Sequence, residues 1–239
     1  MNLFKKTLIL FVASALTVSV SYAQKVKGNG NLIKVNRSVG QFDEVGVGGS
    51  FDVILKKGQE GKLEISVEEN LQSYLVTEVK GGDLKIHWKK GTNVRTTKNT
   101  MVTVYFNSLN GVALAGSGDV SSSDLIKTDH MEVALAGSGD IELEVEANRV
   151  EAAISGSGDI VLNGKSEEFE GAIAGSGDLK ADGLETKKAT MKISGSGGMS
   201  ISVQDELFAR ISGSGDIKYK GNPRIEDIKV SGSGSVGSY

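Results

Sequence analysis

A Gly-Ser-Gly triplet recurs at even intervals through the second half of this chain. Aspartate follows most copies of the triplet, and Gly198 and Ser235 take its place in the other two. A unit of about 20 residues cannot bury an apolar face alone, so an even repeat of this kind indicates units that stack on one another. The triplets begin at Gly116, Gly137, Gly156, Gly175, Gly195, Gly213 and Gly232.

The residues on both sides of each triplet alternate between apolar and polar. Around Gly137, the residues Val133, Leu135, Ile141 and Leu143 share one parity, and the positions between them are small or acidic. A period of two is typical of strands with one buried face. The glycines then mark corners at which the chain bends and a Cβ atom has no room.

We therefore predict an all-β fold, a single-stranded parallel β-helix (solenoid) with Gly-Ser-Gly-Asp coils of about 18–21 residues. The uneven coil length argues against the strict six-residue rhythm of left-handed β-helices and favours a right-handed one. Residues 112–239 form the tandem-repeat solenoid. Residues 24–111 alternate less regularly, and we expect an irregular β N-terminal part that caps the rod, because an open solenoid end exposes a strand edge. One helical turn is expected over residues 68–74.

Residues 1–23 have the layout of a secretory signal peptide. Lys5 and Lys6 precede an uncharged, mostly apolar run over residues 7–20, and small residues lead up to Ala23. The run is shorter than the roughly 20 residues of a transmembrane helix. We expect cleavage before Gln24, no transmembrane segment in the mature chain, and a location in the periplasm, on the cell surface or outside the cell. An uncleaved anchor is the alternative.

Charge is distributed unevenly over the mature chain. Residues 24–111 carry 13 basic and 9 acidic groups, whereas residues 112–239 carry 12 and 21. A net negative chain offers no general basic field for nucleic acid, so we expect no nucleic-acid partner. The chain contains no cysteine, which excludes disulfides and thiolate metal ligands. Its stability must therefore come from backbone hydrogen bonds and core burial.

Several short motifs occur in an order that resembles one known family. The motifs are QFDEV at residues 41–45, LKKG at 55–58, EENL at 68–71 and VKGGDLKI at 79–86, followed by the tandem coils. In this order they resemble the head GIN domain family of autotransporter adhesins over about residues 30–235. The resemblance implies a pectin-lyase-like β-helix in an exported bacterial protein, a role in adhesion, and no established catalytic residue.

The aspartates after the triplets are candidate metal ligands. Asp119, Asp140, Asp159 and Asp178 come from consecutive coils and would stack about 4.8 Å apart. Like charges at that spacing repel unless they are compensated, and Ca²⁺ could compensate them. The interpretation that we favour is structural, with each carboxylate accepting N–H bonds of its own corner as in an Asx turn. We therefore expect no cofactor, with calcium as the alternative.

Small residues occupy the outward positions before each corner. They form a flat surface suited to a partner, or simply an ordinary exposed face, since alanine and serine are tolerated on any such face. The first column contains Ala115, Ala136, Ser155 and Ala174 and continues with serines. The second column contains Ala113, Ala134, Ala153 and Ala172, before Thr190, Arg210 and Lys229 interrupt it.

A shallow site around Trp88, His87, Tyr74 and Tyr105 is a further candidate for carbohydrate binding. Only 5% of the residues are aromatic, which argues against an extensive cleft for stacking sugars. No nucleophile–histidine–acid constellation can be assembled. We expect a non-catalytic, adhesin-like binding or structural module of the cell envelope that recognises a glycan or protein through a solenoid face. The alternative is a polysaccharide lyase or hydrolase on the same rod. The oligomeric state stays open.

Overall fold

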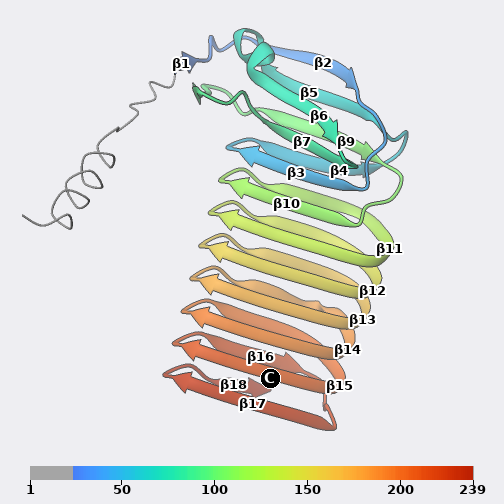
Figure 1. Ribbon diagram of the computed structural model, residues 1–239, viewed down its shortest axis with the longest axis vertical. Coiled ribbons are helices and arrows are strands. Elements are labelled where there is room, and N and C mark those ends of the chain that lie inside the picture. Colours follow the sequence, from blue (N-terminus) through green and yellow to red (C-terminus); the bar gives the residue numbers. More distant parts are fainter. Residues whose placement is uncertain (1–23, 239) are drawn as a thin grey trace, which may run out of the picture.

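The protein is a rod of stacked parallel coils with an irregular β region at its N-terminal end (Figure 1). The computed structural model describes residues 24–238, and the predicted signal peptide lies outside them. The predicted all-β parallel solenoid is confirmed. Within the described part of the chain, no helix has the length and apolar character needed to cross a membrane.

Each regular coil contributes one strand segment to each of two opposite faces of the rod. We call the face whose segments lead into the Gly-Ser-Gly corners the front face, and the face whose segments follow the corners the rear face (Figure 1). Neighbouring coils pair in parallel and in register, so that Gly137, Gly156 and Gly175 lie side by side. The strands of these coils are β10 (Gly111–Gly116), β11 (Val120–Gly137), β12 (Ile141–Gly156), β13 (Ile160–Gly175), β14 (Leu179–Gly195), β15 (Gly198–Gly213), β16 (Asp216–Lys220), β17 (Ile225–Gly232) and β18 (Val236–Ser238). β10 and β17 lie in the front face only, and β16 and β18 lie in the rear face only.

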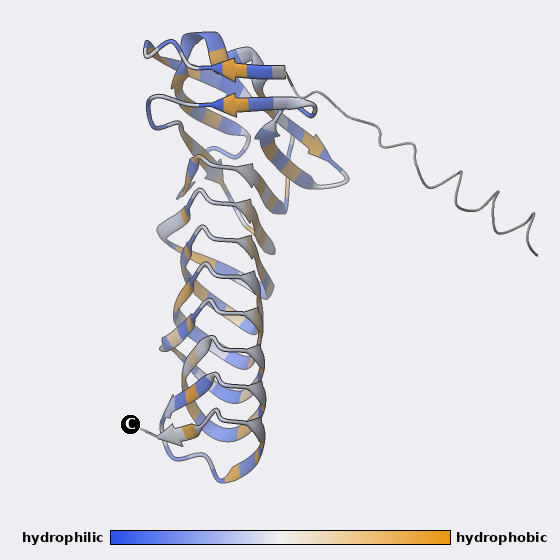
Figure 2. Ribbon diagram, turned by 90° about the vertical axis from the view of Figure 1, so that its left-hand side faces the viewer, coloured by the Kyte–Doolittle hydropathy of each residue, from blue (hydrophilic) through white to orange (hydrophobic). Residues whose placement is uncertain are grey.

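The core fills the narrow space between the two faces. In β12, Leu143 and Val145 point inward from the rear face, and Val150 and Ile154 point inward from the front face; all four are buried. Apolar and polar residues alternate along the coils in Figure 2, as the sequence predicts. The rod is therefore one continuous apolar core enclosed by two parallel sheets.

The corners require glycine for two different reasons. Gly156 has a φ of +143°, a conformation that side chains disfavour. Gly158 has no such φ, but a Cβ there would overlap the carbonyl oxygen of Gly139 in the preceding coil. The corners also continue the hydrogen-bonded ladder, because the N–H of Ser157 donates to the carbonyl of Gly137 at 2.9 Å. The prediction that the corner has no room for a Cβ is confirmed.

The N-terminal region is not stacked in sequence order. β3 (Glu44–Gly49) and β4 (Asp52–Lys57) form a coil that pairs with β10 and β11, which come much later in the chain. On its other side, the same coil pairs with β7 (Asp83–Trp88) and β9 (Met101–Phe106). The chain therefore forms the β3–β4 coil first and then the strands at the N-terminal end of the rod, on one side of this coil. It then continues with β10 and β11 on the opposite side of the same coil. The strands of this region thus do not stack in chain order.

Antiparallel strands close the N-terminal end of the rod. On the rear face, β5 (Lys62–Glu68) pairs with β9 and β2 (Leu32–Ser38) pairs with β5. On the front face, β6 (Leu75–Lys80) pairs with β7. The expected helical turn is present as the 3₁₀ helix η2 (Glu69–Tyr74). A parallel two-stranded ribbon of β1 (Gln24–Lys27) and β8 (Thr92–Arg95) completes the region.

A buried carboxylate ties this ribbon to the rest of the cap. Glu68 is fully buried and accepts hydrogen bonds from the N–H of Gly30 at 2.6 Å, from the N–H and Oγ1 of Thr97 at 2.8 and 2.6 Å, and from the N–H of Lys98 at 3.3 Å. Burial alone would raise the pKa of Glu68, but the bonds from Thr97, Gly30 and Lys98 outweigh it and hold the pKa at about 2.

Candidate functional site

The outward side chains of the front face form a flat strip of small residues. The register places Ala115, Ala136, Ser155 and Ala174 side by side in four consecutive coils. β3 extends both columns into a fifth coil, so the strip is about 19 Å long at 4.8 Å per coil. The Gly/Ala strip comprises Gly46, Gly48, Ala113, Ala115, Ala134, Ala136, Ala153, Ser155, Ala172 and Ala174.

The strip is the floor of a shallow groove of about 1150 Å³. Lys85 and His87 of β7 lie at one end of the groove, and three cations lie toward the other end. The first of these is Lys192, since β14 pairs Lys192 with Ala172 and Thr190 with Glu170. The expectation that Thr190 interrupts the second column is therefore wrong. Lys192, the next outward residue after Thr190, occupies that position. Arg210 and Lys229 follow as expected.

An ion-pair network borders the strip. Arg149 donates from Nε to Glu151 at 2.6 Å, from Nη1 to Glu168 at 3.1 Å and from Nη2 to Glu170 at 2.9 Å. Lys192 Nζ also reaches Glu170, at 2.7 Å. The hydrogen bond from Lys192, supported by Arg149, lowers the pKa of Glu170 against the opposing effect of its partial burial. Glu151, Glu168 and Glu170 are thus held in ion pairs beside the strip.

One cluster near the strip has the composition of a metal site. The ligating atoms of His130, Glu132 and Glu151 lie within 4.8 Å of one another. However, Arg149 donates to Glu151 at 2.6 Å and already compensates its charge. A divalent cation would have to displace this guanidinium from a partly exposed site. We assign no metal to the cluster.

The corner aspartates form a hydrogen-bonded ladder along the rod. Oδ1 of Asp119 accepts the N–H of Asp140 at 3.0 Å, and Oδ1 of Asp140 accepts the N–H of Asp159 at 2.9 Å. Oδ1 of Asp159 continues to the N–H of Asp178 at 2.9 Å. The carboxylates therefore accept N–H bonds from the next coil. The expectation that each would accept N–H bonds of its own corner, as in an Asx turn, is wrong. The expectation that the ladder binds no cofactor stays a prediction, with calcium at the second oxygens as the alternative.

The four candidate aromatic and imidazole side chains do not converge on one site. Tyr105 lies on β9 in the rear face, whereas His87 lies on β7 in the front face, because the two strands run on opposite faces. Tyr74 ends η2, and its carbonyl accepts the N–H of Lys89 at 2.8 Å. Of the four, only His87 lines the groove.

Trp88 has a packing role at the corner of the β3–β4 coil. Its ring meets Phe51 edge-on, with the centroids 5.6 Å apart and an interplanar angle of 83°. A Cβ on Gly49 would lie 3.1 Å from Cδ1 of Trp88, so the indole covers the first corner of the glycine column. Nε1 of Trp88 is buried and has no hydrogen-bond partner among residues 24–238.

Sequence reasoning missed Gly46, Gly48 and Lys85 as parts of the groove. The signal for the two glycines was the VGVGG run at residues 45–49, which repeats the small outward residues of the later coils. Lys85 carried no signal, because its place depends on β7 pairing with β3 outside the repeat.

Solved structures share this fold. A putative adhesin from Bacteroides fragilis NCTC 9343 is 23% identical, with a TM-score of 0.84 over 90% of this chain and 100% of that chain. A putative lipid binding protein from Parabacteroides distasonis ATCC 8503 is 29% identical, with a TM-score of 0.74 over 90% and 100%. A putative adhesin from Parabacteroides merdae ATCC 43184 is 26% identical, with a TM-score of 0.73 over 91% and 100%. A comparison with curated proteins finds no match.

A family profile matches residues 41–223, which is more than half of the chain. The matched segment begins just before the β3–β4 coil and includes the whole Gly/Ala strip. The resemblance drawn from the short motifs and the repeat is confirmed. This chain belongs to the family described as putative auto-transporter adhesin, head GIN domain.

Proposed function

We propose that this protein is a non-catalytic, adhesin-like module that holds a glycan or protein partner along the Gly/Ala strip. One observation carries the proposal: across five coils in register, neither of two adjacent outward columns has a side chain larger than serine. An extended chain lying along the rod can therefore approach the sheet closely. It would meet the same pair of positions again in every coil.

The chemistry around the strip suits recognition better than turnover. The groove offers methyl groups on its floor, with cations toward both ends and carboxylates along one side. A lyase or hydrolase needs a carboxylate or base in the groove that can exchange a proton. Glu151 and Glu170 are instead held in ion pairs with Arg149. Of the described residues that line the groove, none is Phe, Tyr or Trp.

The test blocks the strip in one coil and compares it with the other face of the same strand. Ala153→Trp places an indole on the strip, and Glu144→Trp places one on the exposed rear face of β12. Both proteins, with wild type, are applied to a glycan array and to a panel of immobilised extracellular proteins. We expect Ala153→Trp to lose the wild-type signal and Glu144→Trp to keep it. Equal binding by both variants would place the partner elsewhere, and cleavage of a bound polysaccharide would favour the enzyme.

We also propose that the protein is exported and acts in the periplasm, at the cell surface or outside the cell. Two observations support this: the layout of residues 1–23 and membership of a family of auto-transporter adhesins. The intact mass of the exported protein should correspond to a chain that begins at Gln24. A mature protein that retains residues 1–23 would contradict the proposal.

A further inference from the structure

The β1–β8 ribbon has one apolar side and one basic side. Its parallel register pairs Lys25 with Asn93 and Lys27 with Arg95, so these side chains share one side of the ribbon. They are all exposed. The alternate residues Val26 and Val94 are partly buried against the core. The basic side chains thus lie on the solvent-exposed side of a ribbon whose other side packs against the core through Val26 and Val94.

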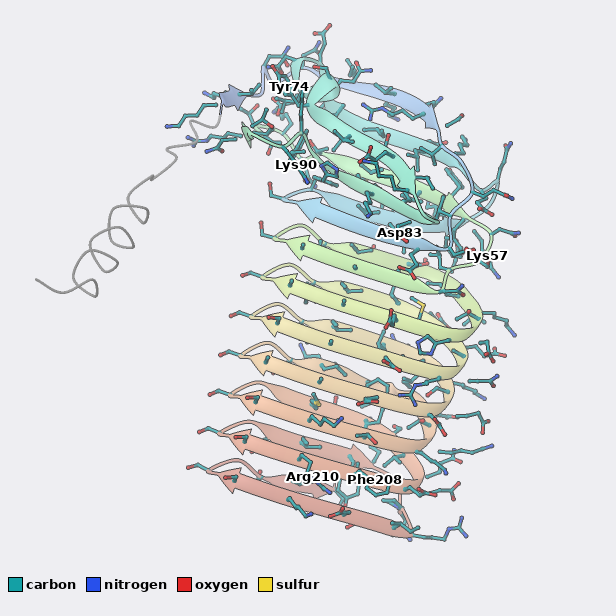
Figure 3. The ribbon with its side chains drawn as sticks, in the orientation of Figure 1. Lys57, Tyr74, Asp83, Lys90, Phe208 and Arg210 are labelled. Carbon is teal, nitrogen blue, oxygen red and sulfur yellow. The ribbon has the colours of Figure 1, made fainter. Side chains whose placement is uncertain are left out.

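The turn before β8 adds two further cations to this surface. Lys89 and Lys90 are exposed in the turn, and Lys90 is labelled in Figure 3. The exposed Glu69 lies nearby, where it accepts a hydrogen bond from Asn31. We call the set the basic ribbon: Lys25, Lys27, Lys89, Lys90 and Arg95.

No residue of the basic ribbon forms an ion pair with any residue in the part of the chain that the structure describes. The preceding residues, 1–23, contain no Asp or Glu that could supply one. Most basic side chains of the described coils differ in this respect, with Lys218 and Lys229 as the exceptions. Lys180, Lys187 and Lys192, for example, hold carboxylates of neighbouring coils at 2.7, 2.6 and 2.7 Å. Unpaired like charges repel, and an anionic ligand would relieve this repulsion.

We propose that the basic ribbon binds the anionic headgroups of a lipid membrane. A fluid layer of headgroups can place an anion opposite each of five cations on an open ribbon, whereas a single small ligand cannot. Each basic side chain near such a surface strengthens binding about fivefold, from roughly 1 kcal/mol per charge. This surface is separate from the Gly/Ala strip, and the inference does not depend on the proposed function.

The position of the ribbon in the chain supports a membrane as its ligand. The apolar run of residues 7–20 ends shortly before Lys25, and the chain between them spans at most about 18 Å when extended. While that run is in a membrane, Lys25 and Lys27 stay within reach of the headgroups. The first acidic residue of the coils is Asp119, which follows β10, and β10 lies two strand spacings beyond β7. This is roughly 10 Å, about one Debye length at 0.1 M salt. The negative surface would repel the coils and favour contact through the ribbon.

Co-sedimentation with vesicles tests the inference. The chain from Gln24 onward is mixed with phosphatidylcholine vesicles that contain or lack phosphatidylglycerol. We expect binding only to the anionic vesicles, and release at high salt. Lys25→Gln/Lys27→Gln/Arg95→Gln should weaken this binding roughly a hundredfold. The matched control Lys34→Gln/Lys56→Gln/Lys57→Gln removes three exposed cations elsewhere on the same end region and should bind like wild type.

Three outcomes would overturn the inference. Equal binding to neutral vesicles would show that charge does not drive the contact. An equal loss in the control variant would show a dependence on net charge without a specific surface. Binding of soluble dextran sulfate that needs the ribbon, with no binding to anionic vesicles, would assign the ribbon to a soluble polyanion. All variants should keep the wild-type melting temperature, because each altered side chain lies in solvent.

Discussion

The regular coils and the N-terminal end of this rod reach stability in different ways. In the coils, an inward apolar residue, a corner glycine and a ladder hydrogen bond recur at the same position in each coil. In the N-terminal end, each contact occurs once: Phe51 fills the corner position that glycine holds elsewhere, and Trp88 covers it. Glu68 likewise satisfies four donors by itself. A repeated part tolerates the loss of one polar contact, whereas a part built from single contacts does not.

The largest effect should come from a methyl group added at a corner. Gly158→Ala places a Cβ on the carbonyl oxygen of Gly139, and a backbone atom cannot rotate away. We expect a loss of roughly 3 to 5 kcal/mol in the free energy of unfolding, or failure to fold. Urea denaturation measures it. Gly40→Ala is the control, because a Cβ there meets no atom within 4 Å. Equal stability of the two variants would refute the steric account of the corners.

The next effect should come from the single buried carboxylate of the N-terminal end. Glu68→Gln turns an amide NH₂ group toward backbone N–H donors that the carboxylate now accepts. We expect a loss of about 2 to 3 kcal/mol at pH 7, from hydrogen bonds lost and donors left unpaired. Glu69→Gln, at the exposed neighbouring position, should change little. Hydrogen exchange should quicken near Gly30 and Thr97 and stay unchanged in the coils.

The pH dependence of the same variant gives an independent check. The pKa of Glu68 is about 2 in the folded protein, below the ordinary 4.5. The ionised carboxylate therefore stabilises the fold fully above pH 4.5, and this contribution is lost as the pH falls toward 2. The stability difference between wild type and Glu68→Gln should be constant from pH 7 to 5 and shrink below that. A difference that persists undiminished at pH 2 would contradict this assignment.

A smaller effect is expected from the aspartate ladder. Asp140→Asn/Asp159→Asn keeps an amide oxygen that accepts the N–H groups of Asp159 and Asp178, so the double variant should lose less than about 1 kcal/mol. Replacing both by alanine should cost about 2 kcal/mol. We expect wild type to melt at the same temperature in chelator and in millimolar Ca²⁺. A calcium-dependent rise that the asparagine variant loses would establish a cation site on the ladder.

The smallest effect on stability is expected from a substitution of Ser157, which lies between the two glycines of a corner. Ser157 is exposed, and the bond to Gly137 comes from its backbone N–H, which alanine retains. Ser157→Ala should change the free energy of unfolding by less than about 0.5 kcal/mol. Thermal melts of Ser157→Ala beside Gly158→Ala compare two adjacent residues of one corner. A large loss for Ser157→Ala would mean that the corner depends on its hydroxyl.

The repeated part of the fold could be predicted because every coil has the same pattern of alternating apolar and polar residues around a Gly-Ser-Gly corner. The parity of Leu135 or Ile141 fixes which side is buried, and the even spacing of the corner glycines fixes the register. The column of Ala115, Ala136, Ser155 and Ala174 followed directly from that register. The second column, which contains Ala172, was misassigned in β14. Its members share the same distance in sequence from the corner glycine, and this distance has to be counted back from Gly195. Counted in that way the position belongs to Lys192, and Thr190 lies one outward position further from the corner.

The arrangement of the N-terminal end could not be predicted, because it depends on contacts between distant segments. Nothing in the local pattern of β3 indicates that β7 will lie on one side of it and β10 on the other. For the same reason, Tyr105 and His87 were assigned to one site although they lie on opposite faces. The basic ribbon likewise depends on the pairing of β1 with β8, which lie far apart in the chain.

The insertion of the β3–β4 coil between two later coils has a consequence for the order of folding. Every coil from β11 onward can dock on a neighbour that is already made, so the rod can lengthen as the chain emerges. The β3–β4 coil cannot be completed in that way, since both of its neighbours are synthesised after it. It must wait for β7 and β9 on one side and for β10 on the other, at a cost in loop closure. The earliest coil in the chain is therefore secured only after β10 and the first residues of β11 have been synthesised. An export pathway that keeps the chain unfolded until β10 has emerged would match this order.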